Sequence, residues 1–393
     1  MAEQVAMDYE ELLRLTKRLI ALESHVDVPQ REVDVAHHLV EWFSDHGIEA
    51  SLSPAEGDRA NVVARIRGGE GPSLMLNGHL DTVPAGDMPD AFAPRVEDGV
   101  LWGRGACDMK GAVAAMCCAM ASIAEEGPGE LAGDLVFAGM IGEETGSIGV
   151  KALVDVGVLA TYAVVGEPTE LRVALAHKGA SFLRVLLEGL GAHGSCPEKG
   201  VNAASYAARI VAVLEDELGP KLAERTHPLL GRSTINIGRI CGGTLPNIVA
   251  ENCEIEIDRR YVPGEEAPLD EIRELVSAIC APVEGLKCEV IEMPMTRDVP
   301  HVPLGTAAET KLAKAAAQVC RQTGLDEAPI GVTYWSDGGH LAANGIETIV
   351  FGPGSITDAH SARDHVEIED LNTAADWYRR IAIELLVPGS TKA

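Results

Sequence analysis

Side chains that could bind a metal ion or move protons occur in five short motifs, nearly all of which end an apolar segment. The first two are LMLNGHLDTVP, residues 74–84, and GRGACDMKG, residues 103–111. The third and fourth are FAGMIGEETG, residues 137–146, and VVGEPT, residues 164–169. The fifth is GPGSITDAHS, residues 352–361. Imidazoles and carboxylates together suit zinc, cobalt or manganese, and the motifs contain His79, Asp81, Asp108, Glu143, Glu144, Glu167 and His360.

The first motif places His79 and Asp81 two positions apart. On an extended backbone, two such side chains point to the same side. The carboxylate could then hold the far nitrogen of the imidazole and fix its tautomer, which is the usual support of a metal-bound histidine. A hydrogen-bonded loop without metal is the alternative interpretation of this pair.

The second motif brings Asp108 to the start of residues 110–126, a segment that we expect to be helical. Asp108 could cap this helix. Alternatively, the preceding glycines could let the chain turn tightly and bring the carboxylate against a bound ion.

The third motif sets Glu143 and Glu144 directly after an apolar strand. Two desolvated carboxylates repel each other unless a cation lies between them. One of the two could bind metal while the other moves protons. One metal ion needs only about three or four protein ligands. Five candidate ligands and a further glutamate therefore favour a two-metal centre bridged by one carboxylate. The competing interpretation is a plain α/β protein with capped helices and hydrogen-bonded loops.

The elements that must position these motifs form a layered α/β pattern. Apolar segments without polar alternation predict buried strands, and helical segments separate them, so we expect a central, mostly parallel sheet covered on both faces. The predicted strands are 61–66, 74–76, 135–141, 162–165 and 346–351, and the predicted helices are 8–22, 31–46, 110–126, 147–156, 306–323 and 370–387.

The pattern changes near residue 172, where half-buried strands with alternating polarity begin. Strands are predicted at 172–176, 180–188, 233–240, 250–258 and 286–292, and helices at 200–217 and 268–280. From 180 on, this order is typical of a two-layer α+β sandwich of the ferredoxin-like type. We therefore predict a discontinuous core domain, residues 1–176 and 293–393, interrupted by an inserted domain, residues 177–292.

The chain carries 32 Lys+Arg against 60 Asp+Glu, which gives a formal net charge of −28. Such an acidic surface repels phosphate backbones and anionic lipids, so we expect neither nucleic-acid nor membrane binding. We find no stretch of 18 uninterrupted apolar residues and no apolar core of signal-peptide type at the N-terminus. The nine cysteines are odd in number and no pair has C-x-x-C spacing, so we expect a reduced, cytoplasmic protein.

Taken together, the motifs resemble those of the dizinc metallopeptidase family that includes acetylornithine deacetylase, succinyl-diaminopimelate desuccinylase, aminoacylase-1 and the glutamate carboxypeptidases. The resemblance runs from about residue 10 to 390, with the motifs in the family's order and spacing. It implies two Zn²⁺ ions per subunit, with Co²⁺ or Mn²⁺ as possible substitutes. Asp108 would bridge the two ions, His79 and Glu167 would complete one site, and Glu144 and His360 the other.

The same resemblance implies that Asp81 orients His79 and that Glu143 is the general base. It also identifies the inserted domain with the family's lid and dimerisation domain. His193, in GAHGSCPEKGVNA, would then stabilise the oxyanion in the partner subunit of a homodimer. Asn247 and Arg260 would contact substrate, with Arg260 binding its carboxylate and Arg259 as the competing candidate.

Two positions depart from the family pattern. Tyr334 and Trp335 stand before Ser336-Asp337 where relatives often have Gly-Thr, and two aromatics near the pocket could change which substrate fits. Asp364 stands where a glutamate is usual, which puts the role of this shorter side chain in doubt.

The function that the resemblance implies is hydrolysis of the amide bond of an N-acyl-amino acid. A carboxypeptidase or dipeptidase acting on short peptides is the alternative within the same family. A protein of another class, which binds metal or senses a ligand without turnover, also remains open.

Overall fold

The structure is a computed structural model, and it describes residues 7–127, 131–266 and 268–388. The described chain separates into two compact units. Unit 1 comprises residues 1–176, 304–332 and 336–393, and unit 2 comprises residues 177–303 and 333–335, to the extent that these residues are described.

Unit 1 is built on one large mixed sheet with the strand order β1-β2-β6-β3-β7-β17-β8-β15, and β16 pairs with β8. The four central strands, β6, β3, β7 and β17, run parallel to one another. The outer pairs β1/β2, β2/β6 and β17/β8 are antiparallel. The strands are β1 (Glu49–Glu56), β2 (Arg59–Ile66), β3 (Leu74–His79), β6 (Leu135–Met140), β7 (Tyr162–Val165), β8 (Ala174–His177), β15 (Leu304–Gly305), β16 (Ile330–Val332) and β17 (Glu347–Val350).

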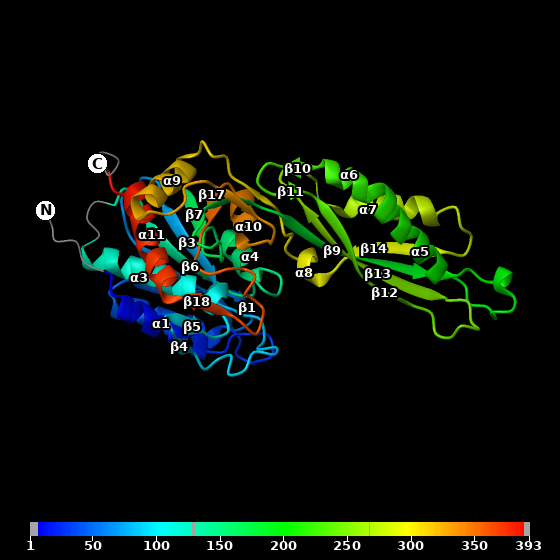
Figure 1. The fold of residues 1–393 in the computed structure, drawn as a ribbon, viewed down its shortest axis with the longest axis horizontal. Coiled ribbons are helices and arrows are strands. Elements are labelled where there is room, and N and C mark those ends of the chain that lie inside the picture. Colours follow the sequence, from blue (N-terminus) through cyan, green and yellow to red (C-terminus); the bar gives the residue numbers. More distant parts are fainter. Residues whose placement is uncertain (1–6, 128–130, 267, 389–393) are drawn as a thin grey trace. The chain divides into compact units, whose positions relative to one another are not determined.

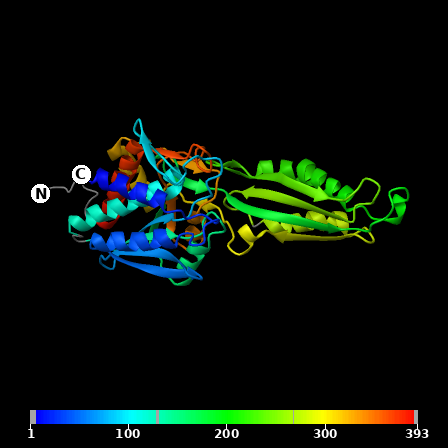
Figure 2. The same cartoon turned by 90° about the horizontal axis from the view of Figure 1, so that it is seen from below.

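Helices cover this sheet, and every residue of β3, β6 and β7 is buried. Figure 1 shows α3 and α11 side by side, and Figure 2 shows α2 alongside the β1/β2 pair, in agreement with their close packing. This layered arrangement confirms the predicted fold class. The helices of unit 1 are α1 (Tyr9–Ala21), α2 (Val33–Asp45), α3 (Gly111–Glu125), α4 (Ile148–Asp155), α9 (Lys311–Thr323), α10 (Asp337–Ala343) and α11 (Ile368–Leu386).

A single irregular turn of helix, η1 (Ala106–Lys110), precedes α3. Together they form a segment, Ala106–Glu125, that is long and apolar enough to cross a membrane by length and composition alone. Its apolar residues lie in the core of unit 1, and a fully buried core helix meets the same criterion. A small separate sheet joins β18 (His365–Glu367), β5 (Val100–Trp102) and β4 (Arg95–Glu97) in that order.

Unit 2 is a four-stranded antiparallel sheet in the order β12-β13-β9-β14, packed against helices on one face. Figure 1 shows α5 and α7 lying along this sheet. The chain order is strand, helix, strand, strand, helix, strand, which is the ferredoxin-like order predicted for the insertion. The main elements are β9 (Gly179–Glu188), α5 (Ala203–Val213), η3 (Leu214–Leu218), α6 (Gly219–Glu224), β12 (Thr234–Gly242), β13 (Asn252–Tyr261), α7 (Pro268–Cys280) and β14 (Lys287–Glu292); shorter ones are η2 (Pro197–Lys199), β10 (Thr226–His227), β11 (Gly231–Arg232) and α8 (Pro294–Arg297).

The second boundary of unit 2 differs from the predicted one at residue 292. Residues 293–303 belong to unit 2 because they are hydrogen-bonded to β9. The Met293 amide donates to the Phe182 carbonyl at 2.8 Å, and the Ala180 amide donates to the His301 carbonyl at 2.9 Å. Trp335 joins them by stacking on the His301 ring, with centroids 3.9 Å apart. Main-chain hydrogen bonds and a single ring contact leave no periodic pattern of apolar residues, so the sequence could not show that residues 293–303 belong to unit 2.

Candidate metal centre

Three of the predicted site segments follow neighbouring parallel strands. His79 ends β3, Glu143 and Glu144 come shortly after β6, and Glu167 comes shortly after β7. The carboxyl ends of parallel strands lie at one edge of a sheet, where ligands bind in open α/β folds. Asp108 is brought to the same edge by η1, and His360 by the loop between β17 and β18.

The Asp108 carboxylate lies between the two histidines. Its Oδ1 is 2.9 Å from His79 Nε2, and its Oδ2 is 3.3 Å from His360 Nε2. His79 Nε2 is also 3.9 Å from Glu167 Oε1, and His360 Nε2 is 2.9 Å from Glu144 Oε1. The five predicted ligands are therefore linked into one cluster, with Asp108 at its centre.

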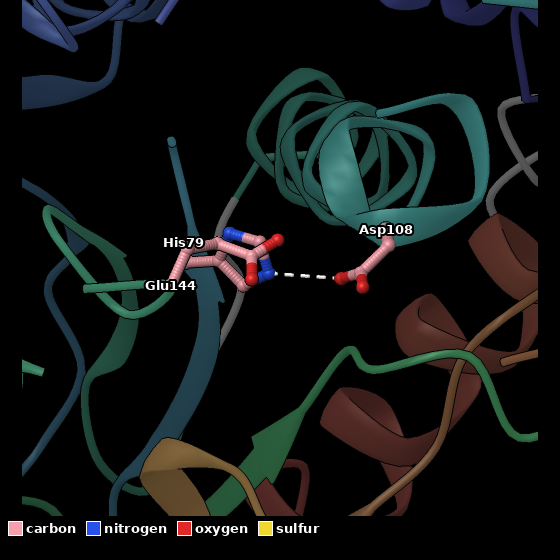
Figure 3. A group of neighbouring side chains, drawn as sticks. All are labelled: His79, Asp108 and Glu144. Atoms are coloured by element: carbon pink, nitrogen blue, oxygen red, sulfur yellow. Dashed lines mark hydrogen bonds and ion pairs between the residues drawn. The ribbon is translucent and has the colours of Figure 1, made fainter. Parts of the chain in front are cut away.

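Ligand atoms of His79, Asp108 and Glu144 all lie within 4.8 Å of one another. Figure 3 shows the His79 ring next to the Glu144 carboxylate, with the Asp108 carboxylate facing them from the start of the α3 segment. The His79, Asp108 and Glu167 side chains are buried, whereas the His360 side chain is 51% exposed. The cluster is thus enclosed by protein on the side of the sheet and open beside His360.

Asp108 does not cap the helix that follows it. The N-cap position of α3 is Lys110, and no side-chain hydrogen bond caps the helix. The peptide bond between Asp108 and Met109 is cis, and Gly105 has a φ of 85°. The helix-cap interpretation of Asp108 is therefore wrong, and its carboxylate instead faces the two imidazoles.

The electrostatics of the cluster fit a cation. Burial, reinforced by the charge of neighbouring carboxylates, raises the pKa of Glu143 and of Glu167 well above the ordinary value. Hydrogen bonds to Asp108 and Glu144 raise the pKa of His360 to about 10. Burial alone would lower the pKa of His79, but its contact with Asp108 and the charge of Glu167 raise it well above normal. Excess negative charge of this kind is what a divalent ion neutralises.

Asp81 contacts His79 more closely through its main chain than through its carboxylate. The closest contact of His79 Nδ1 is the main-chain oxygen of Asp81, at 2.9 Å, whereas the Asp81 carboxylate is 3.6 Å away. A proton on Nδ1 leaves Nε2 free to act as a ligand, so the carbonyl fixes the tautomer. The carboxylate instead accepts hydrogen bonds from the amides of Glu143 and Glu144, at 3.2 and 3.1 Å. It ties the turn after β6 to the end of β3.

Asp364 holds the loop that leads to Asp108. Its Oδ2 accepts hydrogen bonds from Arg104 Nη1 at 3.0 Å and from the Gly105 amide at 2.7 Å, and its Oδ1 accepts one from the Cys107 amide at 3.0 Å. The side chains of Arg104 and Asp364 are 2% and 1% exposed. The doubt raised by the shorter aspartate is thereby answered for this chain, because Asp364 reaches every one of these donors.

The sequence did not single out Glu32, Arg59 or Asn61, which also support the turn after β6. Glu32 and Asn61 are buried polar residues of α2's N-terminus and of β2, and Arg59 begins β2. Asp337, at the start of α10, likewise lies outside the five motifs. It is 1% exposed, and burial raises its pKa to about 7. An isolated acid in a helix cap or loop gives no sequence signal that separates it from a surface residue.

His193 and Asn247 lie together in unit 2. The Gly194 amide donates to the Asn247 carbonyl at 2.7 Å, and His193 forms a β-bridge with Ile248. The His193 side chain is exposed, with Nδ1 2.7 Å from the Ser195 hydroxyl oxygen.

Arg259 and Arg260 point to opposite faces of β13, as expected for adjacent strand residues. Arg259 is on the helix-covered face, 1% exposed, and its Nη2 is 2.7 Å from Glu265 Oε2. Arg260 is on the other face, 29% exposed, where it contacts Asp258 at 2.8 Å and lies over the Phe182 ring. Of the two, only Arg260 has a guanidinium outside the packed interior.

The Trp335 ring is not open to a ligand in this structure. It is 8% exposed, and it stacks on His301 while its Nε1 donates to the Val302 carbonyl at 3.0 Å. Packing within unit 2 accounts for the position of Trp335, and an effect of the two aromatics on substrate fit stays a prediction.

Comparison with known proteins agrees with this geometry. A family model described as peptidase family M20/M25/M40 matches residues 75–384. The acetylornithine deacetylase of Myxococcus xanthus is 31% identical over 340 residues, which cover 81% of this chain and 82% of that protein.

Solved structures show the same fold. The aminopeptidase PepT of Bacillus cereus superposes with a TM-score of 0.81 at 23% identity, covering 96% of this chain and 99% of that one. A protein of Bacillus subtilis described as a dinuclear metal binding peptidase of the M20 family gives a TM-score of 0.71 at 17% identity, covering 95% and 97%. On the family match and the identity to the deacetylase, this chain is a member of peptidase family M20/M25/M40.

Proposed function

We propose that the protein hydrolyses the amide bond of an N-acyl-amino acid with two bound metal ions, zinc being the first choice and cobalt or manganese possible substitutes. The observation that carries the proposal is the position of Asp108, whose two carboxylate oxygens face His79 and His360 separately. A carboxylate placed in this way can bridge two ions. Glu167 beside His79 and Glu144 beside His360 would complete the two sites.

When bound, the ions would polarise the amide carbonyl and lower the pKa of a coordinated water molecule. Glu143 would act as general base and later return the proton to the leaving amine. The amide contact with Asp81 holds the Glu143 main chain beside the cluster, and the charges of Glu167 and His79 act on its carboxylate. Without metal, burial raises the pKa of Glu143 well above its usual value, and strongly perturbed acids of this kind cluster at catalytic sites.

Unit 2 would serve as a lid and dimerisation domain, and unit 1 as the catalytic domain. In a homodimer, the exposed imidazole of His193 would stabilise the oxyanion in the active site of the partner subunit. Asn247 would add a polar contact to substrate. Arg260 would bind the substrate carboxylate, a role that its planar guanidinium suits.

Acylated amino acids are favoured over peptides as substrates because the named deacetylase is 31% identical to this chain. The likeness to an aminopeptidase, at 23% identity, supports the fold alone. A carboxypeptidase or dipeptidase activity is therefore the second outcome to test. All nine cysteines lie in the described residues and are free thiols, which supports a reducing, cytoplasmic location.

The test is a panel assay of the metal-depleted and the zinc- or cobalt-loaded protein. The panel contains acetyl, succinyl and formyl derivatives of several amino acids, together with dipeptides. We expect metal-dependent release of free amino acid from at least one acyl derivative. Activity on dipeptides alone would replace the proposal by a peptidase, and a protein that binds no metal after reconstitution would refute it.

Glu143→Ala distinguishes an enzyme from a protein that only binds ligands. We expect turnover to fall by about a thousandfold or more while zinc content, measured by elemental analysis, stays at the wild-type level, because a general base and its proton transfers are lost but no proposed ligand is. Unchanged turnover would exclude Glu143 as the base.

A further inference from the structure

Four consecutive backbone amides in the turn after β6 donate to side-chain oxygens from elsewhere in unit 1. The Ile141 amide donates to Asn61 Oδ1 at 3.1 Å, and the Gly142 amide donates to Glu32 Oε1 at 3.0 Å. The next two amides donate to the two oxygens of the Asp81 carboxylate, at 3.2 and 3.1 Å. Regular secondary structure would satisfy such groups within the backbone. Here the position of each amide depends on a distant side chain.

Glu32 and Asn61 both lie outside the sequence motifs, and of the two only Glu32 has a carboxylate. It occupies the N-cap position of α2 and is 1% exposed, yet its side chain does not cap the helix. Its two oxygens instead face the guanidinium of Arg59, with Nε to Oε2 at 2.8 Å and Nη2 to Oε1 at 2.7 Å. The guanidinium offsets the desolvation cost of the buried carboxylate, and its two contacts fix the orientation of the oxygen that accepts from the Gly142 amide.

The ion pair also packs directly against the turn. Gly142 has a φ of 67°, and a Cβ at this position would lie 3.1 Å from Arg59 Nη2 and 3.0 Å from Ile148 Cγ1. The guanidinium therefore occupies space that a side chain would need. Glu32 accepts the hydrogen bond of this glycine's amide, and the Arg59 guanidinium lies next to the position that a Cβ would take.

We propose that Glu32, oriented by Arg59, is a positioning residue that fixes the turn carrying Glu143 and Glu144. The inference rests on the proposed function, in which the first of these glutamates is the base and the second a metal ligand. Asn61 fixes the strand side of the turn and Asp81 fixes the two glutamates, so Glu32 controls the glycine between them. Misplacement of a catalytic group by about 1 Å can cost about a hundredfold in rate.

Two glutamates that both contact Arg59 provide a matched pair of variants. Glu56 Oε2 lies 2.6 Å from Arg59 Nη1, but the Glu56 side chain is 60% exposed. Within the described residues, the Glu56 carboxylate makes no hydrogen bond or ion pair with the turn, so removal of its charge changes the surroundings of Arg59 alone. Glu32→Gln is isosteric but has one amide nitrogen that must face either the guanidinium or the Gly142 amide, both of which are donors.

For Glu32→Gln at saturating zinc, we expect kcat to fall by about ten- to a hundredfold, with KM within about twofold and metal content unchanged. For Glu56→Gln, we expect kcat, KM and metal content within about twofold of the wild-type values. Hydrogen exchange measured by mass spectrometry on peptides containing the 141–144 amides should be faster in Glu32→Gln than in Glu56→Gln. A purely structural role would lower the melting temperature but leave kcat per folded, metal-loaded molecule unchanged, and that result overturns the proposal.

The exchange measurement separates this inference from the proposed function. If the wild-type protein hydrolyses no amide in the panel, the proposed function fails, whereas the exchange comparison still decides whether Glu32 holds the turn. Equal exchange in the two variants would refute the inference even if wild type is active. Should Glu32→Gln not fold, Glu32→Asp keeps the charge but shortens the side chain, and the same kcat loss and faster exchange are expected from it.

Discussion

Replacement of Asp364 by asparagine tests how much the buried contact with Arg104 contributes to unit 1. The carboxylate accepts three hydrogen bonds, from Arg104, Gly105 and Cys107. Asparagine retains one acceptor oxygen and turns a donor toward either the guanidinium side or the Cys107 amide. The change removes the negative charge opposite an arginine that is 2% exposed.

Loss of one partner from a buried ion pair costs about 3–5 kcal/mol. We take the lower end, about 3 kcal/mol, for two reasons. Arg104 keeps two other acceptors, the carbonyls of Pro84 and Ala85, both at 3.1 Å. Burial also raises the pKa of Asp364 to about 6, so the native carboxylate already bears a desolvation cost. With an unfolding entropy of about 2.1 cal/mol/K per residue, about 3 kcal/mol corresponds to a fall in melting temperature of roughly 4 °C for this chain.

The assay is thermal unfolding of the metal-depleted protein at pH 8, where Asp364 is ionised and no bound ion masks the change. Arg363→Gln is the control, because its contact with Asp358 is at 3.2 Å and Arg363 is 70% exposed. Such a surface pair contributes less than about 1 kcal/mol. If Asp364→Asn unfolds within about 1 °C of wild type, the Arg104 contact does not stabilise the loop and the reasoning fails.

Two further predictions concern unit 2. Burial lowers the pKa of His177 to about 4. Between about pH 6.5 and 4 the unfolded chain therefore binds more protons at this residue than the folded chain does. The free energy of unfolding should fall as the pH falls through that window, by about 3 kcal/mol in total. The stability difference between wild type and His177→Gln should shrink by about this amount from pH 7 to 4 in urea unfolding, and a constant difference would contradict it. Arg260→Gln should raise KM for a carboxylate substrate by about ten- to a hundredfold with little change in melting temperature, whereas Arg259→Gln should lower the melting temperature because Glu265 loses its buried partner. The opposite assignment of effects would make Arg259 the substrate-binding residue.

The layered fold and the ligand cluster could be predicted because both depend on signals that lie close together in sequence. Apolar strands such as β3, β6 and β7 stand out by composition, and the polar residue that ends each one must lie at the same sheet edge as the others. The strand β1 was not predicted, because its alternation is weak and it contains Pro54. The actual contact of Asp81 was also missed, since spacing shows that it can reach His79 but not that two amides lie nearer to its carboxylate.

The role of a buried acid depends on what lies opposite its oxygens, which no single stretch of sequence contains. Glu32, Asp81 and Asp364 face amide or guanidinium N–H groups, and such donors satisfy the carboxylate without an ion. Asp108 faces the imidazole nitrogens of His79 and His360, and its charge raises the pKa of Glu167, for which burial is the larger cause. An imidazole can give its lone pair to a cation as readily as its proton to an oxygen. The first group of acids therefore supports the backbone at the edge of the sheet, and the second leaves negative charge there that only protons or metal ions can balance.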